Sequence, residues 1–403
     1  RTHVVGAATD TWALAGFAAA VIPGLALWAY GLRLYPLTWD STWSGYHPDM
    51  PFFEALGNGI ARHGLLGSPF LPGVSVRYHW LAYAWQGQLE VSSQALPFIC
   101  LTRLLPLVAL LGCACIVAAW SRRLSGRRWV PILAGLLFAL GGFTGALFGG
   151  VLTMDSPSQS MSVLWLFAFV LLVIHGIRTP SWRWGFPITV AVVSFALMGG
   201  KVSAGAPAVA AVAVLAIGLQ IHGSIAARRA WILLGSALVG AFGGFMFFQA
   251  GAVGGGGLTL GSLIDRSSSQ QGLNPTIGAL GVVLGTFVLV IAVVPRWAGL
   301  GCLLASPTWR WRPETLLGTG LAASSLLALI AFNSFNEVWF STTVSGPLAV
   351  LSAVGAAHAV NRLQSRHGPG SIMILAWGAV FAVCINAVIW VLWMTGASGG
   401  NTW

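Results

Sequence analysis

The sequence predicts an all-α, polytopic membrane protein, and its composition and hydropathy support that prediction. Of its 403 residues, 57% are hydrophobic and only 7% are charged, whereas an ordinary soluble domain is about 25% charged. The mean hydropathy is +0.82, and the chain contains 20 tryptophans. These values exclude a soluble globular enzyme, a disordered chain, a coiled coil and a disulfide-stapled secreted domain.

Eleven apolar segments are predicted to cross the membrane, because about 20 apolar residues span a bilayer core. Only Gly199–Ser203 separate the fifth from the sixth, so this pair could be two tilted helices or a broken, re-entrant pair. We expect one membrane domain over residues 1–403, with a flexible exterior loop at 251–275 and no soluble C-terminal domain. The predicted spans lie near residues 12–32, 97–120, 129–150, 161–177, 185–200, 204–221, 231–250, 276–294, 314–333, 344–360 and 371–395.

The arginines predict the orientation, because basic residues concentrate in cytoplasmic loops. With the N-terminus in the cytoplasm and the C-terminus outside, cytoplasmic segments hold 14 of the 20 basic residues, Arg296 among them. We therefore expect a multi-pass protein of the plasma membrane. Carboxylate chemistry is expected on the exterior, where most acidic residues fall. These are Asp40, Asp49, Glu54, Glu90, Asp155, Asp265 and Glu337.

The first exterior loop, residues 33–96, contains a predicted amphipathic helix over residues 51–63. Pro51 suits the first turn of a helix, and Gly64 suits its end. Glu54 and the residues four and eight positions after it form a polar face, with apolar side chains opposite. This pattern is typical of a helix that lies in the membrane interface. A second helical stretch follows later in the same loop.

Asp49 is the first candidate catalytic residue, because it directly precedes this helix on the exterior side. A carboxylate there could act as general base toward an acceptor hydroxyl, or ligate a divalent cation such as Mg²⁺ or Mn²⁺. The alternative is that Asp49 only caps the helix N-terminus. Asp155, at the start of the fourth span, has the same two interpretations: a second carboxylate of the site, or a cap.

Lys201 is the only lysine of the chain and lies at the exterior break between the fifth and sixth spans. An ammonium beside a helix N-terminus could bind a phosphate group. The alternative is a lysine that extends to the membrane boundary. Trp80 could stack on a sugar ring or anchor the chain in the interface. The remaining substrate-binding candidates are Arg77, His79, His47, Glu54 and Asp40.

Several catalytic and binding motifs are absent from the sequence. It contains no histidine pair with zinc-ligand spacing, no nucleotide-binding glycine pattern and no Gly-x-Ser-x-Gly nucleophile elbow. Only Asp10 and Glu314 are predicted in the cytoplasm, which is a poor ligand set for nucleotide-sugar chemistry there. The centres of the spans carry almost no ionisable groups, which disfavours an ion-coupled transporter. No zinc site and no nucleic-acid partner are predicted.

Three short segments carry a resemblance to a known family. They are His47–Leu56, Tyr78–Leu81 and Thr102–Pro106, with a weaker similarity at Asp155-Ser-Pro and Gly200-Lys201-Val-Ser. In a chain with one span, a long exterior loop and about ten further spans, these segments resemble actinobacterial membrane proteins of the GT-C class. Members of this class are membrane glycosyltransferases that use polyprenyl-phosphate sugars. The resemblance covers roughly the first 110 residues.

The resemblance implies transfer of a sugar from a polyprenyl-phosphate donor to a cell-envelope glycan, lipid or protein acceptor outside the cell. It places Asp49 at the position of the catalytic aspartate, and Asp155 where a second acidic residue often lies. The sequence departs from the family where Met50 follows Asp49, because several members have an Asp-Glu pair. It also departs in ending soon after the last predicted span. These departures leave a second function open: a non-catalytic membrane subunit, or a lipid-linked-glycan transporter, of an envelope complex.

Overall fold

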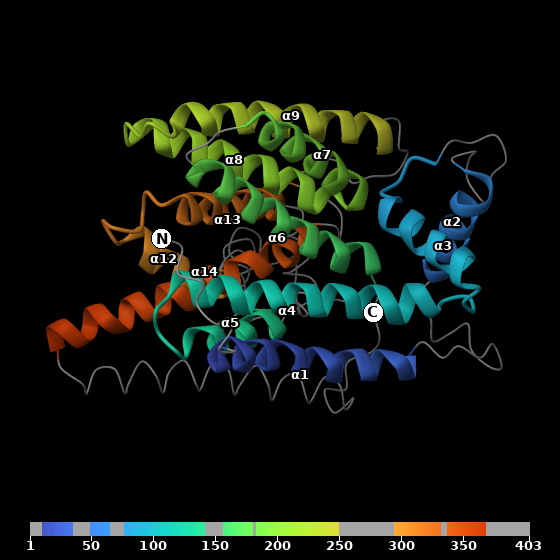
Figure 1. Cartoon of the computed structure of the whole chain (residues 1–403), viewed down its shortest axis with the longest axis horizontal. Helices are drawn as coiled ribbons and strands as arrows, with labels where there is room; N and C mark the ends of the chain where they lie inside the picture. The colour runs from blue at the N-terminus through green and yellow to red at the C-terminus, as the bar shows by residue number, and fades with distance from the viewer. Residues whose placement is uncertain are drawn as a thin grey trace, which may run out of the picture.

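The computed structural model describes residues 10–34, 49–64, 76–141, 156–179, 183–249, 294–331 and 337–367. Within these ranges every regular element is a helix, and the long helices run side by side with roughly parallel axes (Figure 1). Six of these helices are long and apolar enough to cross a membrane. The predicted all-α membrane architecture is therefore confirmed, and the total of eleven spans stays a prediction.

The predicted spans coincide with helices where the structure describes them. The short π-helix η2 (Cys100–Leu104) leads directly into helix α4 (Leu105–Leu124). Most of the predicted span near 276–294, the span near 371–395 and the loop at 251–275 lie outside the described residues. The observed helices are α1 (Thr11–Leu34), α4 (Leu105–Leu124), α5 (Val130–Ala139), α6 (Pro157–Arg178), α7 (Gly185–Gly200), α8 (Val202–Ile221), α9 (Ala227–Phe248), α13 (Pro313–Ala331) and α14 (Glu337–His367).

Small residues allow these helices to pack closely. A Cβ added to Gly16 of α1 would lie 2.6 Å from the Cβ of Pro131 on α5, and one on Gly244 of α9 would lie 2.8 Å from the Phe195 carbonyl oxygen of α7. Within a membrane, helix association depends on such close van der Waals packing, because lipid tails are as apolar as the side chains themselves. The buried core runs through the bundle between α4, α6, α8 and α14.

The described parts of the loop that is predicted to be exterior form a helical hairpin, α2 (Met50–His63) and α3 (Leu81–Ser93), at one end of the bundle (Figure 1). Helix α2 matches the predicted helix at 51–63 to within one residue. The interpretation of its polar face as an interfacial surface needs a correction, because Glu54 is only 7% exposed. The reason is α3, which packs against that face and supplies polar partners for it.

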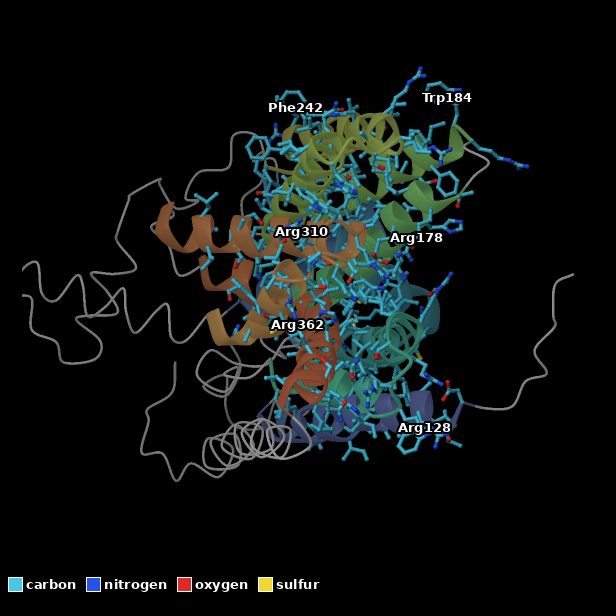
Figure 2. All side chains as sticks on the ribbon, turned by 90° about the vertical axis from the view of Figure 1, so that its left-hand side faces the viewer. Arg128, Arg178, Trp184, Phe242, Arg310 and Arg362 are labelled. Carbon is cyan, nitrogen blue, oxygen red and sulfur yellow. The ribbon has the colours of Figure 1, made fainter. Side chains whose placement is uncertain are left out.

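Most of the described arginines lie at the other end of the bundle. Figure 2, viewed onto that end, labels Arg128, Arg178, Arg310 and Arg362, which come from four separate segments. Arg178 forms an ion pair with Glu314, which is fully buried. The structure thus separates the basic end from the hairpin end, as the arginine pattern predicts. The assignment of the basic end to the cytoplasm stays a prediction.

Arg296, which the orientation prediction places in a cytoplasmic segment, is buried. Its side chain is 1% exposed, in the short 3₁₀ helix η5 (Val294–Trp297) that precedes α12 (Ala298–Leu304). The guanidinium lies 3.5 Å from the Oγ of Ser341, and the Arg296 carbonyl accepts a hydrogen bond from Ser352. Arg296 therefore lies along α14 inside the bundle, where serine hydroxyls contact it.

Candidate functional site

The candidate site lies where the hairpin meets the bundle. Asp49 occupies the position before α2, and its carbonyl oxygen accepts a hydrogen bond of 2.9 Å from the Phe53 N–H. Its side chain makes no capping hydrogen bond and is exposed. The carboxylate is therefore not used as a helix cap, which was the alternative interpretation of this residue.

Lys201 separates α7 from α8, and its extended backbone ends the first helix and begins the second. Its N–H donates to the Leu197 carbonyl, and its own carbonyl accepts from the Ala204 N–H, both at 2.9 Å. Gly200 permits this break beside α6, because a Cβ there would lie 2.8 Å from the Oγ of Ser162. Two separate helices therefore flank Lys201, and whether they are two tilted spans or a re-entrant pair stays a prediction.

The Lys201 side chain turns into the protein. It is only 8% exposed, and its Nζ donates a hydrogen bond of 2.8 Å to the Oγ of Ser156. Ser156 directly precedes α6, and Lys201 directly precedes α8. The N-terminal ends of two long helices therefore meet at this ammonium, and both ends carry partial positive charge. This arrangement is suited to an anion such as a phosphate group.

The electrostatics of the site connect Asp49 to Lys201. Burial lowers the pKa of Lys201 to about 7, while the nearby Asp49 acts in the opposite direction. Burial, and then Lys201, lower the pKa of His79 well below its usual value, so its imidazole is neutral at pH 7. Burial, and then Asp49, raise the pKa of Tyr78. These four side chains therefore lie within electrostatic range of one another.

Contacts between aromatic rings hold together the side of the site that the hairpin forms. The rings of Tyr78 and His79 have centroids 3.8 Å apart, and Phe53 stacks on Tyr83 at 4.5 Å. The Tyr83 hydroxyl donates to the Oγ of Ser158, 3.0 Å away in the first turn of α6. This hydrogen bond attaches the hairpin to the helix whose N-terminal end adjoins Lys201.

A buried polar network continues from this point into the bundle. The Ser203 hydroxyl is 3.1 Å from the Thr343 hydroxyl and donates to the Gln159 carbonyl oxygen at 3.3 Å. The Gln159 amide donates to Thr342 at 3.3 Å and also to Thr343. The network joins α6, α8 and α14 directly beneath Lys201. Sequence reasoning missed it, because these residues are far apart in the chain.

The structure brings together Asp49, His79 and Lys201 from the predicted set. Arg77 is exposed beside His79, in the segment that leads into α3. Trp80 is buried, with its ring centroid 4.8 Å from that of Phe248 on α9, so it packs within an aromatic cluster. Glu54 is buried between α2 and α3. The remaining candidates lie outside the described residues: Asp40, His47 and Asp155.

Sequence reasoning also missed three residues of the site: Ser156, Tyr78 and Tyr83. Signals for the first two were present, since Ser156 lies within Asp155-Ser-Pro and Tyr78 within Tyr-His-Trp, two segments of the family resemblance. As for a metal, no group of three His, Cys, Asp or Glu side chains in the described part of the chain could hold an ion. Of the carboxylates predicted to ligate one, Asp49 alone is described.

Comparison with known proteins gives matches in structure only. No protein-family model matches the sequence, and no curated protein sequence matches it. The fold matches the Archaeoglobus fulgidus oligosaccharyltransferase in complex with Zn and sulfate, with a TM-score of 0.53 and 15% identity, over 91% of this chain and 52% of that one. It also matches AglB from the same organism in complex with an inhibitory peptide and a dolichol-phosphate, with a TM-score of 0.52 and 13% identity, over 93% and 55% of the two chains.

A third structure of this oligosaccharyltransferase, tethered to an acceptor peptide containing the NVT sequon, gives a TM-score of 0.54 at 14% identity over 94% of this chain and 55% of that one. The chain spans about half the length of these structures. At such low identity the match concerns the fold, which agrees with the family that the segments around Asp49 resemble. The chain therefore has the GT-C fold of the archaeal oligosaccharyltransferase AglB.

Proposed function

We propose that the protein is an integral membrane glycosyltransferase that moves a sugar from a polyprenyl-phosphate donor to an acceptor on the exterior side. The observation that supports it best is the position of Lys201, buried between two helix N-termini and within electrostatic range of Asp49. A lipid phosphate and an acceptor hydroxyl would then meet between an ammonium and a carboxylate. The fold neighbours are oligosaccharyltransferases, one of them in complex with a dolichol-phosphate.

In the proposed step the acceptor hydroxyl attacks the anomeric carbon of the donor sugar. A bond forms between the hydroxyl oxygen and this carbon, and the bond from the carbon to the phosphate oxygen breaks. The phosphate leaves with the bonding electron pair and is stabilised by Lys201 and the two helix N-termini. Asp49 takes the hydroxyl proton. The cell-envelope acceptor is a glycan, a lipid or a protein.

A divalent cation, Mg²⁺ or Mn²⁺, stays a prediction for this site. Asp49 could supply one oxygen ligand, and Asp155 and Asp40 are the other predicted carboxylates. One fold neighbour is in complex with Zn. The step above is written only with residues of this chain, and Asp49 as general base requires no metal.

The test is transfer by the purified protein in liposomes, supplied with a panel of polyprenyl-phosphate sugars and with envelope glycans, lipids and proteins as acceptors. Asp49→Asn should fold like the wild type and lose transfer by about 10²–10⁴-fold, the usual contribution of a general base. Asp10→Asn is the matched control, because Asp10 lies at the arginine-rich end and bonds Arg122. Its transfer should equal the wild-type rate. Undiminished turnover by Asp49→Asn would contradict the proposed role, and a wild-type chain that forms no product would favour a non-catalytic subunit or a transporter.

A further inference from the structure

A second polar cluster lies inside the hairpin, apart from Lys201. Glu54 and Asn58 on α2 face Gln86 and Glu90 on α3, and both glutamates are buried. The Asn58 amide donates to the Glu54 carboxyl at 2.8 Å and to the Glu90 carboxyl at 3.0 Å. The Gln86 amide donates to the other Glu54 oxygen at 3.0 Å. Four side chains, two from each helix, thus form one hydrogen-bonded group.

The Glu54 carboxyl also connects the hairpin to the start of α4. It accepts a hydrogen bond from the backbone N–H of Phe98, a residue in the left-handed conformation with φ of 66°. Left-handed backbone is unfavourable for a bulky side chain, so it needs local support. Glu54 therefore contacts α2, α3 and the turn that leads into η2 and the bundle.

The two carboxyls lie side by side, because the amide nitrogen of Asn58 bonds both of them. Two carboxylates this close cannot both ionise in a buried site, so one holds a proton that it donates to the other. Glu54 is the protonated member: it accepts from the amides of Asn58 and Gln86 and donates its proton to Glu90, whose Oε1 has no other hydrogen-bond partner in the described part of the chain. The donors are all neutral groups, so no cation compensates a second negative charge from within the group.

Other ionisable groups near the pair do not change this conclusion. The Cys100 thiol of η2 lies near both carboxyls and carries no positive charge. Helix α7 carries no ionisable residue, and the ionisable residues of α6 lie in its last turn, away from the hairpin. No ion pair joins either carboxyl to a cation in the described part of the chain. The remaining ionisable groups on the elements packed against the pair are Arg62 and His63 in the last turn of α2, Tyr83 on α3 and Arg103 on η2.

We propose that Glu54 and Glu90 share one proton and that this carboxyl pair positions Asp49 by holding α2 against α3 and the Phe98 turn. Asp49 lies one turn before Glu54, whereas His79 lies on the segment that leads into α3. Separation of the two helices would therefore move the carboxylate away from His79 and Lys201. The role of Asp49 in transfer rests on the proposed function, but the shared proton and the closure of the hairpin do not.

The pair makes the hairpin sensitive to alkaline pH. Burial, and then the neighbouring Glu90, raise the pKa of Glu54 from 4.5 to about 9. A raised pKa means that the folded chain holds a proton which the unfolded chain releases. The stabilisation is therefore complete below about pH 4.5, declines as the pH rises and is lost above about pH 9. Loss of the proton leaves two buried negative charges in contact, which separates the helices.

Hydrogen exchange of the full chain in lipid nanodiscs tests the proposal without any need for activity. After correction for the intrinsic rate, exchange protection of peptides from α2 and α3 should fall by about tenfold or more between pH 7 and pH 10. Glu90→Gln removes the second negative charge and supplies an amide donor to the Glu54 carboxylate, so its hairpin should lose much less protection than the wild type over this range. Peptides from α9 serve as the internal reference.

Constant wild-type protection up to pH 10 would overturn the proposal, and so would an equal loss of protection in Glu90→Gln. Glu54→Gln provides the second variant: it too removes the shared proton and should abolish the pH dependence, even where its hairpin is less protected at pH 7. Where transfer is measurable, kcat should fall on the alkaline side much more for the wild type than for Glu90→Gln. The KM for the lipid donor should be equal in both. A protein without transferase activity would still show the exchange profile, so the two proposals fail separately.

Discussion

Replacement of Gly57 by alanine should open the hairpin, because this glycine lies at the closest approach of α2 and α3. An added Cβ would lie 2.7 Å from the Tyr83 carbonyl oxygen and 2.7 Å from the Gln86 side-chain oxygen. The ordinary contact begins at 3.4 Å, so α2 would have to move by about 0.7 Å against a backbone atom that cannot rotate away. Overpacking of this kind costs about 1–3 kcal/mol.

Gly59→Ala is the matched control, on the same helix two residues further along. A Cβ there meets nothing within 4 Å, and both changes gain the same helix propensity of about 1 kcal/mol. The difference between the two variants therefore isolates the packing cost. We expect about 2 kcal/mol, which corresponds to about a 30-fold difference in hydrogen-exchange protection of the hairpin peptides.

Hydrogen-exchange mass spectrometry in nanodiscs measures this difference directly. Gly59→Ala should be protected as well as the wild type or better, whereas Gly57→Ala should lose protection and transfer together. Equal protection in the two alanine variants would refute the close approach of α2 and α3. It would also remove the structural basis for placing Glu54 against Glu90.

Four further outcomes follow from the site and from the basic end of the bundle. Binding of polyprenyl phosphate, measured as Kd, should weaken from pH 6 to pH 8. The reason is that Lys201, with a pKa of about 7, loses its charge over this range. The variant Lys201→Gln should bind weakly at both pH values. The same lowered pKa makes folding stability rise between about pH 7 and pH 10.5, where the unfolded chain binds the extra proton. Tyr83→Phe should cost about 1 kcal/mol in denaturant unfolding, because buried Ser158 loses its donor; no change would mean that this bond does not hold α3 on α6. Arg178→Ala should lower the free energy of unfolding by about 2 kcal/mol, since it leaves buried Glu314 without its cation. This loss is smaller than for a fully buried pair, because Arg178 is 44% exposed. Adding Glu314→Gln to that variant should recover most of the loss.

Hydropathy and the proline and glycine residues at helix ends predict most of the helices, because both act over short stretches of sequence. Pro51 and Gly64 bound α2 almost where the structure places its ends, and the glycines before Lys201 mark the break between α7 and α8. In each case the decisive interaction is within a few residues. Lys201 is identifiable for a related reason. A charged side chain within an apolar membrane chain costs free energy, so a single lysine beside a helix start indicates a functional site.

The features that the sequence could not predict depend on contacts between distant segments. The sequence pattern places Glu54 on a solvated helix face, whereas in the structure α3 covers that side chain. Arg296 lies in a Pro-Arg-Trp segment that resembles a loop, whereas in the structure it lies along α14, next to Ser341 and Ser352. The Gln159 network likewise combines three helices. Spacing along the chain carries no information about these partners.

The length of α14 fixes the depth of the site in the bilayer. Its 31 residues extend over about 46 Å, whereas the hydrocarbon core is about 30 Å thick. The exposed polar turn that begins at Asn361 marks one boundary of that core, and twenty residues back along the helix lead to Ser341. Thr343, and with it the start of α8 at Lys201, therefore lies within about one turn of the opposite boundary. That is the level at which lipid phosphates reside, so a prenyl-linked sugar could reach Lys201 with its hydrocarbon chain still in the membrane.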